Sequence, residues 1–192
     1  MDTQKIINGV KVNELFGTIE AVKKAPVIAK FKFRANNQWM DCGHNRTTIK
    51  DFYGTQQDHP HGKYFELDAD EPPVLLGEDK GPNPVEYLLT ALAACVTTSI
   101  VYHAAAKGIT LNAVESRVEG DIDLHGFLGL REDVRRGFQQ IRMMFKIDAD
   151  VPEAELEALL KLGPTFSPVY DSITKGVPVM VELDKESSRA AA

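Results

Sequence analysis

Cys95 has the clearest capacity for chemistry in this sequence, because a thiolate is a strong nucleophile and is readily oxidised. Two small residues, Ala93 and Ala94, precede it, and Ser99 follows one helical turn later. On a helix, Cys95, Ser99 and Tyr102 would lie on one stripe of the surface. The pattern predicts a thiol with free space beside it. A packing role is the competing interpretation, since buried cysteines commonly fill the core.

A reactive thiol at Cys95 would need a nearby cation to favour the thiolate. No positive charge is supplied by the polar residues of the same segment that could lie near the thiol, which are Glu86, Ser99 and Tyr102. An arginine must therefore come from elsewhere in the fold or from a second subunit, and Arg34 and Arg46 are the candidates. Arg34 ends a predicted strand beside a turn, so a solvated strand end is its alternative role.

Neither a metal nor a cofactor is predicted. His59-Pro60-His61 resembles a metal-binding pair, but Cys42, His44 and Asp58 are spaced too loosely to complete a site. We expect the remaining two histidines, His103 and His125, to be structural. The sequence also lacks a phosphate-binding glycine loop, a Gly-x-Ser-x-Gly elbow and a His-Glu-x-x-His motif.

The length of 192 residues predicts one domain. Lysine and arginine total 22 against 28 for aspartate and glutamate, so the net charge of −6 argues against a nucleic-acid partner. Two cysteines are too few for a disulfide scaffold. The first residues, Met1 to Gln4, lack the basic start of a signal peptide, so we expect a cytoplasmic, reducing location.

The segment around Cys95 predicts one long helix. Asn83 suits the N-cap, Pro84 suits the first helical position, and Gly108 suits the end, which gives a length of roughly 36 Å. The segment is apolar nearly all round, so we expect it to be buried on more than one side. A membrane span is the competing interpretation. Polar residues such as Glu86 and His103 interrupt the run and no basic flank sets an orientation, so no membrane association is predicted.

The N-terminal part predicts an amphipathic helix within residues 10–24, followed by a strand from Val27 to Trp39 with a turn signal at Asn36-Asn37. Residues 41–63 predict a weakly regular excursion with a short strand at 46–52. Another strand is expected at 64–67.

The C-terminal part predicts two antiparallel strands, at 114–124 and 141–147, joined by a polar excursion over 126–137. A helix from Pro152 is expected to stop at Gly163, and a second one to run from Ser167-Pro168 to Gly176. Residues 177–183 predict a final strand. This order places the fold in the α+β class. The predicted division is an N-terminal accessory helix in 1–26, one domain in 27–184 and a frayed tail in 185–192.

The segment from Gly81 to Cys95, Gly-Pro-Asn-Pro-Val-Glu-Tyr-Leu-Leu-Thr-Ala-Leu-Ala-Ala-Cys, closely resembles the long cysteine helix of the OsmC and organic hydroperoxide resistance superfamily. The resemblance extends to residues 67–73, to Ser167-Pro168-Val169-Tyr170, and to Gly176 with the final predicted strand. It therefore spans most of residues 27–184.

This resemblance implies an OsmC-like α+β fold, in which antiparallel sheets pack on two central helices and two chains intertwine into a homodimer with active sites at the interface. Family members resemble thiol peroxidases that reduce organic hydroperoxides, and a dithiol donor restores them. Cys95 matches the attacking cysteine. Arg34 matches approximately the arginine that pairs with the thiolate.

Two positions depart from the family pattern. Ser167 stands where the resolving cysteine precedes a proline, so the usual internal disulfide cannot form and an external thiol reductant is implied. Ser167 also suits a helix N-cap. Val85 stands where peroxidase members carry the acidic residue that holds the arginine, and Glu86 follows one position later, which rotates it by about 100°.

Three functional hypotheses remain open. The first is a peroxidase that reduces hydroperoxides through Cys95, with Arg34 and Glu86 assisting and Tyr102, Ser99 and Ser167 near the substrate; a variant lets Cys42 resolve Cys95. The second is a stress-related dimer that binds a small apolar ligand in an interfacial pocket. The third is another thiol-dependent transfer reaction. In the first hypothesis, the pocket is lined by aromatic side chains such as Phe31, Phe33, Trp39 or Tyr102.

Overall fold

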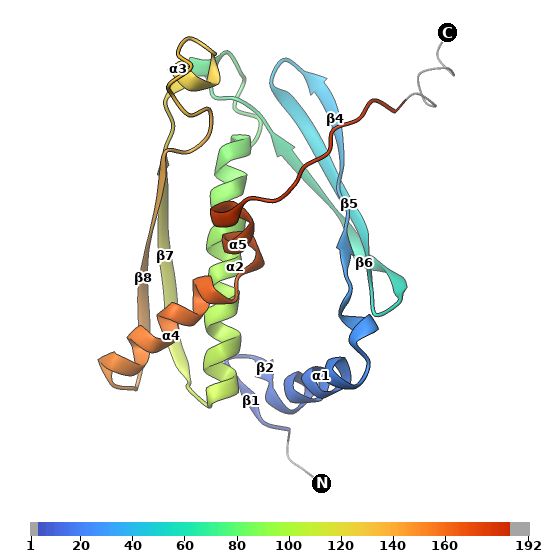
Figure 1. Ribbon diagram of the computed structural model, residues 1–192, viewed down its shortest axis with the longest axis vertical. Helices are drawn as coiled ribbons and strands as arrows, with labels where there is room; N and C mark the ends of the chain where they lie inside the picture. Colours follow the sequence, from blue (N-terminus) through green and yellow to red (C-terminus); the bar gives the residue numbers. More distant parts are fainter. Residues whose placement is uncertain (1–3, 185–192) are drawn as a thin grey trace.

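The computed structural model describes residues 4–184, and the tail expected at 185–192 lies outside them. Figure 1 shows helix α2 (Pro84–Lys107) running through the middle of the molecule. A sheet of β7 (Leu111–Asp121) and β8 (Gln140–Ala149) flanks it on one side, with α3 (Leu124–Phe127) between these strands in the chain. Helices α4 (Glu153–Thr165) and α5 (Pro168–Lys175) pack against α2.

The other side of the molecule holds a four-stranded sheet made of β3 (Lys32–Phe33), β4 (Asn36–Asp41), β5 (His44–Gly54) and β6 (Gln57–Ala69). Strands β1 (Ile6–Ile7) and β2 (Val10–Lys11) form a small hairpin before helix α1 (Val12–Lys24), and two short 3-10 turns lie at Pro26–Ala29 and Pro73–Leu75. All strand pairs of the described chain are antiparallel, so the expected α+β class is confirmed.

The long helix was predicted correctly at both ends. The Asn83 side chain accepts a hydrogen bond from the amide of Val85 at 3.0 Å, and Gly108 takes the left-handed conformation with φ of 82°. The core forms where this helix meets α4 and the β7–β8 sheet, around the buried side chains of Val96, Ile100 and Leu159. The helix expected within 10–24, the antiparallel pair and the helix after Ser167 are also confirmed.

Several predicted elements of the N-terminal part were wrong. The strand expected from Val27 to Trp39 is broken into a 3-10 turn and two strands, and the turn signal Asn36-Asn37 begins β4 instead. The expected weakly regular excursion is a long hairpin of β5 and β6, which contains and so confirms both expected strands, at 46–52 and at 64–67. Cross-strand pairing with β5 outweighs the local turn preference of these polar residues.

The C-terminal part contains three further differences. Leu124, expected on a strand, begins α3, because Asp123 caps that turn by accepting from the amide of His125 at 2.9 Å. Helix α4 continues past Gly163 to Thr165. Residues 177–183, expected to form a strand, pair with no strand of the described chain, and Val181 is 91% exposed. An extended segment becomes a strand only when a neighbour supplies hydrogen bonds.

Gly163 fixes the distance between α4 and α2. A Cβ atom at this position would come within 2.8 Å of Ile100 Cγ1 and 2.9 Å of Val96 Cγ1, so only glycine permits this approach. Its buried packing explains why the helix does not stop at this glycine: the tertiary contact compensates for the low helix propensity of glycine.

Asp70 fixes the loop that leads into α2. Asp70 is 1% exposed, and its carboxylate accepts hydrogen bonds from the amides of Glu71 (2.8 Å), Glu78 (3.1 Å) and Lys80 (3.2 Å). Burial raises the pKa of the Asp70 carboxyl, but the three amide donors outweigh burial, so the pKa lies below its ordinary value. The ionised carboxylate therefore holds residues 71–80 folded ahead of Asn83.

Replacing Gly163 by alanine should lower the free energy of unfolding by about 1 to 3 kcal/mol, because the added methyl group forces the two helices apart. Gly17 of α1 is the matched control, since nothing lies within 4 Å of its added Cβ. Gly17→Ala should raise stability by about 0.5 to 1 kcal/mol through helix propensity alone. Urea denaturation of both variants measures the difference, and equal effects would contradict the packing argument.

Asp70→Asn should lower the Tm at neutral pH by on the order of 5 °C. The asparagine side chain has one neutral oxygen that can accept hydrogen bonds, whereas the carboxylate has two charged oxygens, so the three backbone amides would not all keep their acceptor. Since folding lowers this pKa, the stabilisation is present above the unfolded value near 4 and is lost as the pH falls below it. The Tm difference from the wild type should therefore shrink in acid.

Asp79→Asn, an exposed change in the same loop, is the control and should leave the Tm nearly unchanged. Thermal unfolding followed by circular dichroism at several pH values gives both results. A difference between wild type and Asp70→Asn that stays constant down to strongly acidic pH would show that the charge of Asp70 is not what matters.

Candidate functional site

Cys95 lies near the middle of α2 and is partly exposed, whereas the next residue, Val96, is 1% exposed and belongs to the core. The Ser99 hydroxyl lies 3.0 Å from the carbonyl oxygen of Cys95. Both cysteines of the chain are free thiols in this structure. Cys95 thus stands at the border between the packed side of α2 and its open side.

The junction between α4 and α5 lies one helical turn beyond Cys95. The Ser99 hydroxyl is 3.3 Å from the carbonyl oxygen of Phe166, and the Phe166 ring packs on His103 with a centroid distance of 4.5 Å. Ser167 follows directly and is 1% exposed. The structure therefore brings Ser99 and Ser167 to the same junction, close to the turn that carries Cys95.

Ser167 has a structural task at this junction. Its hydroxyl oxygen accepts a hydrogen bond from the amide of Tyr170 at 3.2 Å and caps α5, as its sequence position suggested. Tyr102, the third member of the predicted stripe, is 48% exposed. It is open to solvent or to a partner molecule.

Glu86 is occupied at the start of α2. Its carboxylate accepts a hydrogen bond from the amide of Asn83 at 2.8 Å and completes a capping box. Nine residues separate it from Cys95, which corresponds to about 13.5 Å along the helix axis. Within one chain, Glu86 therefore does not reach the thiol.

Arg34 is held by two carboxylates on the four-stranded sheet. Its guanidinium donates to Asp51 at 2.5 Å and to Asp58 at 2.7 Å. The hydrogen bond with Asp58 has the larger effect and that with Asp51 the next, and both raise the pKa of Arg34. Arg46 donates to both oxygens of Asp68, at 2.9 and 3.1 Å. Both candidate arginines are thus neutralised by acidic neighbours.

His44 shares the Asp68 carboxylate with Arg46, at 2.9 Å. The hydrogen bond from Arg46, and after it that from His44, lowers the pKa of Asp68. The cluster lies beside the start of α2, because the Tyr87 hydroxyl donates to the carbonyl oxygen of Asp68 at 2.7 Å. The side chains of this cluster therefore join β5 to β6, whereas the backbone of Asp68 contacts α2 through Tyr87.

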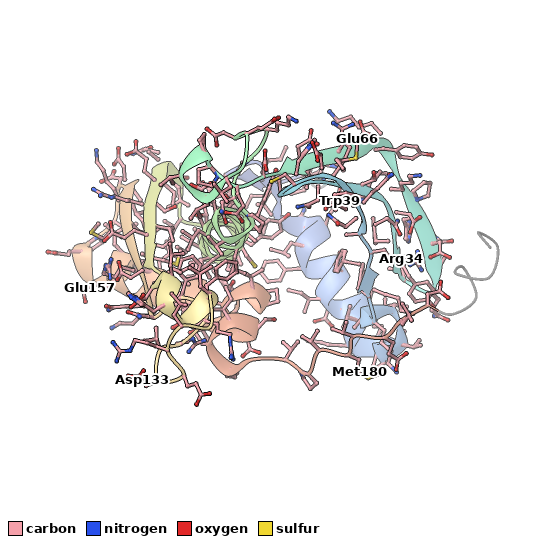
Figure 2. The ribbon with its side chains drawn as sticks, turned by 90° about the horizontal axis from the view of Figure 1, so that it is seen from above. Arg34, Trp39, Glu66, Asp133, Glu157 and Met180 are labelled. Carbon is pink, nitrogen blue, oxygen red and sulfur yellow. The ribbon has the colours of Figure 1, made fainter. Side chains whose placement is uncertain are left out.

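The four-stranded sheet has one charged and one aromatic face. Arg46, Gln38 and Asp68 form one cross-strand row, so they share a face that also includes Glu66, whereas Trp39 lies on the other face. Figure 2 shows Trp39 on the side of the sheet nearer α2 and Glu66 on the outside. Arg46 therefore points away from the side of the sheet that is nearer α2.

The aromatic face of the four-stranded sheet was predictable from the sequence only in part. Phe33 stacks on Phe52 at a centroid distance of 5.8 Å, and Phe52 stacks on His59 at 5.1 Å. Phe31, His61 and Phe65 extend this cluster. The histidines that suggested metal binding thus pack among aromatic rings, and no group of three metal-binding side chains occurs among residues 4–184. Their position depends on hairpin register, which local sequence does not reveal.

Cys42 occupies the β4–β5 turn with φ of 45°, and its thiol lies 3.2 Å from the carbonyl oxygen of Leu76. Gly43 beside it packs near Asp70, so this turn lies next to the loop that precedes α2. Cys95 is twelve residues beyond Asn83, about 18 Å along the helix.

Helix α2 is long and apolar enough to cross a membrane by length and composition, and 28% of its most apolar stretch is buried within the chain. The core helix of a folded domain meets the same criteria. In this structure α2 packs on α4, α5 and β7, in the middle of the molecule (Figure 1).

The profile of the OsmC-like protein family matches residues 77–182, which include α2, the β7–β8 sheet and both C-terminal helices. No curated protein matches the sequence.

Solved structures share the fold at low identity. An OsmC-like protein from Mycoplasma pneumoniae is 19% identical with a TM-score of 0.56, and the match covers 79% of this chain and 94% of that one. An organic hydroperoxide resistance protein OsmC from Legionella pneumophila is 21% identical with a TM-score of 0.53, over 77% and 93% of the two chains. An OsmC-like protein of unknown function from Vibrio cholerae is 11% identical with a TM-score of 0.53, over 74% and 94%.

The family profile covers more than half of the sequence, and the structural matches share its α+β architecture of antiparallel sheets and helices. The chain therefore belongs to the OsmC-like protein family.

Proposed function

We propose that the protein is a homodimeric thiol peroxidase that reduces organic hydroperoxides through Cys95 and is recycled by an external thiol in the cytoplasm. The observation that carries the proposal is the partly exposed Cys95 thiol on the central helix of an OsmC-like fold. A relative of the same fold is named an organic hydroperoxide resistance protein, which supports this substrate class.

The proposed reaction has two steps. The Cys95 thiolate attacks the terminal oxygen of the hydroperoxide, the O–O bond breaks, and the products are a sulfenic acid at Cys95 and the alcohol. Two external thiols then reduce the sulfenic acid, which releases water and one disulfide of the reductant. An external reductant fits this chain because Ser167 occupies the family's resolving position and because Cys42 lies by the loop ahead of α2.

The amount of exposed surface supports a dimer. The chain exposes 14295 Å², whereas a compact monomer of its mass exposes about 9,100 Å². The excess of about 5,000 Å² per chain is at least as large as the area that one subunit of an obligate dimer buries, since such interfaces bury about 2,000–5,000 Å² or more over both subunits together. Phe33 (77% exposed) and Trp39 (68% exposed) on the four-stranded sheet, and Val181 (91% exposed) beyond α5, are large apolar side chains that a partner subunit would cover.

In a dimer, the arginine that activates Cys95 can come from the partner subunit, which matters for the roles of Arg34 and Glu86. In the described chain neither side chain is free, since Arg34 binds two aspartates and Glu86 caps α2. In the proposal, an arginine approaches the Cys95 thiol from the partner subunit, with Tyr102, Ser99 and Ser167 at the edge of the substrate site. The neutralised arginines favour the second candidate function, a non-catalytic dimer that binds a small apolar ligand.

Peroxidase activity is tested by intact-protein mass after one equivalent of cumene hydroperoxide, with a sulfenic-acid trap present. The wild type and Cys42→Ser should form the trapped adduct rapidly, and Cys95→Ser should form none. Loss of two hydrogens that needs both cysteines would make Cys42 the resolving partner instead. No reaction in the wild type would overturn the peroxidase proposal and leave the ligand-binding dimer as the better account.

The same assay tests the arginines. Arg34→Ala should slow the trapping of Cys95 by about tenfold or more, because the nearby cation favours the thiolate. Arg46→Ala is the comparison, since the guanidinium of Arg46 is also paired with a carboxylate, that of Asp68. Unchanged reactivity in Arg34→Ala would remove this residue from the mechanism, and slowing only in Arg46→Ala would assign the role to Arg46.

The dimer is tested by sedimentation, which should give twice the chain mass of 21.2 kDa in buffer without detergent. Phe33→Asp should weaken the dimer by about tenfold or more, because the interface would have to bury an unpaired carboxylate. Tyr64→Asp is the control: Tyr64 is 64% exposed but alternates with Phe65 onto the other face of β6. A monomeric wild type, or equal effects of both changes, would contradict the proposed interface.

A further inference from the structure

A partly open cavity of about 810 Å³ lies between the N-terminal half of α2, strand β8 and the helices α4 and α5 of the described chain. Its walls are mainly apolar and include Leu88, Leu92, Ile141, Met143, Phe145 and Ile173. The size falls within the range of natural small-molecule sites. Cys95 does not line it, so this cavity is distinct from the thiol site proposed above.

The charged groups of the cavity are all positive. Arg135 and Lys161 line it, and no aspartate or glutamate does. Both residues are exposed, and neither forms an ion pair with any residue in the described part of the chain. This contrasts with Arg34, Arg46 and Arg142, whose guanidinium groups are held by carboxylates. An apolar cavity with two unpaired cations is complementary to an anion that carries a hydrocarbon chain.

The segment that carries Arg135 is held in place by close backbone contacts. A Cβ atom on Gly126 would come within 2.4 Å of the carbonyl oxygen of Arg135, so only glycine lets α3 pack there. The amide of Gln139 donates to the carbonyl oxygen of Asp121 at 2.8 Å, and the Phe138 ring lies over Gly120. The Arg135 backbone is therefore fixed before any ligand binds, which lowers the entropic cost of binding.

We infer that this cavity binds an amphiphilic carboxylate, with its alkyl chain along the apolar wall and its head group at Arg135. Arginine suits this task because its planar guanidinium donates two parallel hydrogen bonds to a carboxylate. Lys161, on α4, adds a second positive charge that favours the same class of ligand. The site goes beyond the peroxidase proposal, since it uses neither Cys95 nor the residues placed around it.

Calorimetric titration with dodecanoate, below its micelle concentration, tests the inference. Dodecanoate should bind saturably, and its neutral methyl ester should bind about tenfold more weakly or worse, because it cannot pair with the guanidinium. Arg135→Gln should weaken dodecanoate binding to the same degree. Arg136→Gln, a neighbouring exposed arginine that does not line the cavity, should leave it unchanged.

A blocking variant tests the location. Thr174 lines the cavity and is exposed, so Thr174→Trp should fill the entrance and abolish binding while circular dichroism shows an unchanged fold. Equal affinity for the acid and its ester, or equal losses in Arg135→Gln and Arg136→Gln, would overturn the head-group assignment. Absence of saturable binding would overturn the site itself and indicate that a second copy of the chain covers the cavity.

The titration is repeated in Cys95→Ser. Dodecanoate binding should persist there, because the thiol lies outside the cavity. This variant separates the two proposals: loss of peroxide reduction with retained binding supports two independent sites. Loss of dodecanoate binding in Cys95→Ser would contradict the separation and place the carboxylate at the thiol.

Discussion

The close contact between α2 and α4 at Gly163 is the constraint on which the rest of the described core depends. It brings the Val96 and Ile100 side chains against the backbone of α4 and so sets the distance between the two helices. The α4–α5 junction then falls beside Ser99, one turn from Cys95. The same spacing leaves the cavity between β8 and the helices nearer the start of α2, where the packing is looser.

Electrostatic pairing differs between the two sheet arginines and the cations of the cavity. On the four-stranded sheet, the guanidinium groups of Arg34 and Arg46 each form an ion pair with at least one carboxylate, and these ion pairs link neighbouring strands. Around the cavity, Arg135 and Lys161 have no such partner in the described chain. Several other lysines and arginines of the described chain also lack an acidic partner, so it is the apolar cavity beside Arg135 and Lys161 that marks this place as one where an external anion would be stabilised.

The sequence predicted best what is encoded locally. The limits of α2 follow from Asn83, Pro84 and Gly108, and the α+β class follows from the order of the periodic segments. The β5–β6 hairpin was missed because its turn residues, Thr55 and Gln56, both have positive φ and are not the residues that usually adopt it. The sequence predicted that α4 ends at Gly163, and this was wrong because a tertiary contact with α2 stabilises the helical conformation of this glycine.

The site was predictable only in part for the same reason. Cys95, Ser99 and the capping role of Ser167 depend on helix geometry, which the sequence contains. The carboxylates around Arg34, the aromatic cluster around Phe52 and the cations of the cavity depend on which strands and helices meet. Such contacts between distant segments have no signature in a single sequence.

The tight turn at Thr55 and Gln56 has a consequence for how this molecule can be altered. The turn joins only β5 and β6 and makes its chain reversal with two non-glycine residues in the left-handed conformation. An Asn-Gly pair would adopt that conformation with less strain. This tip of the hairpin is therefore a suitable place to graft a reporter peptide, because it lies outside α2, which carries Cys95, and outside the elements that line the cavity.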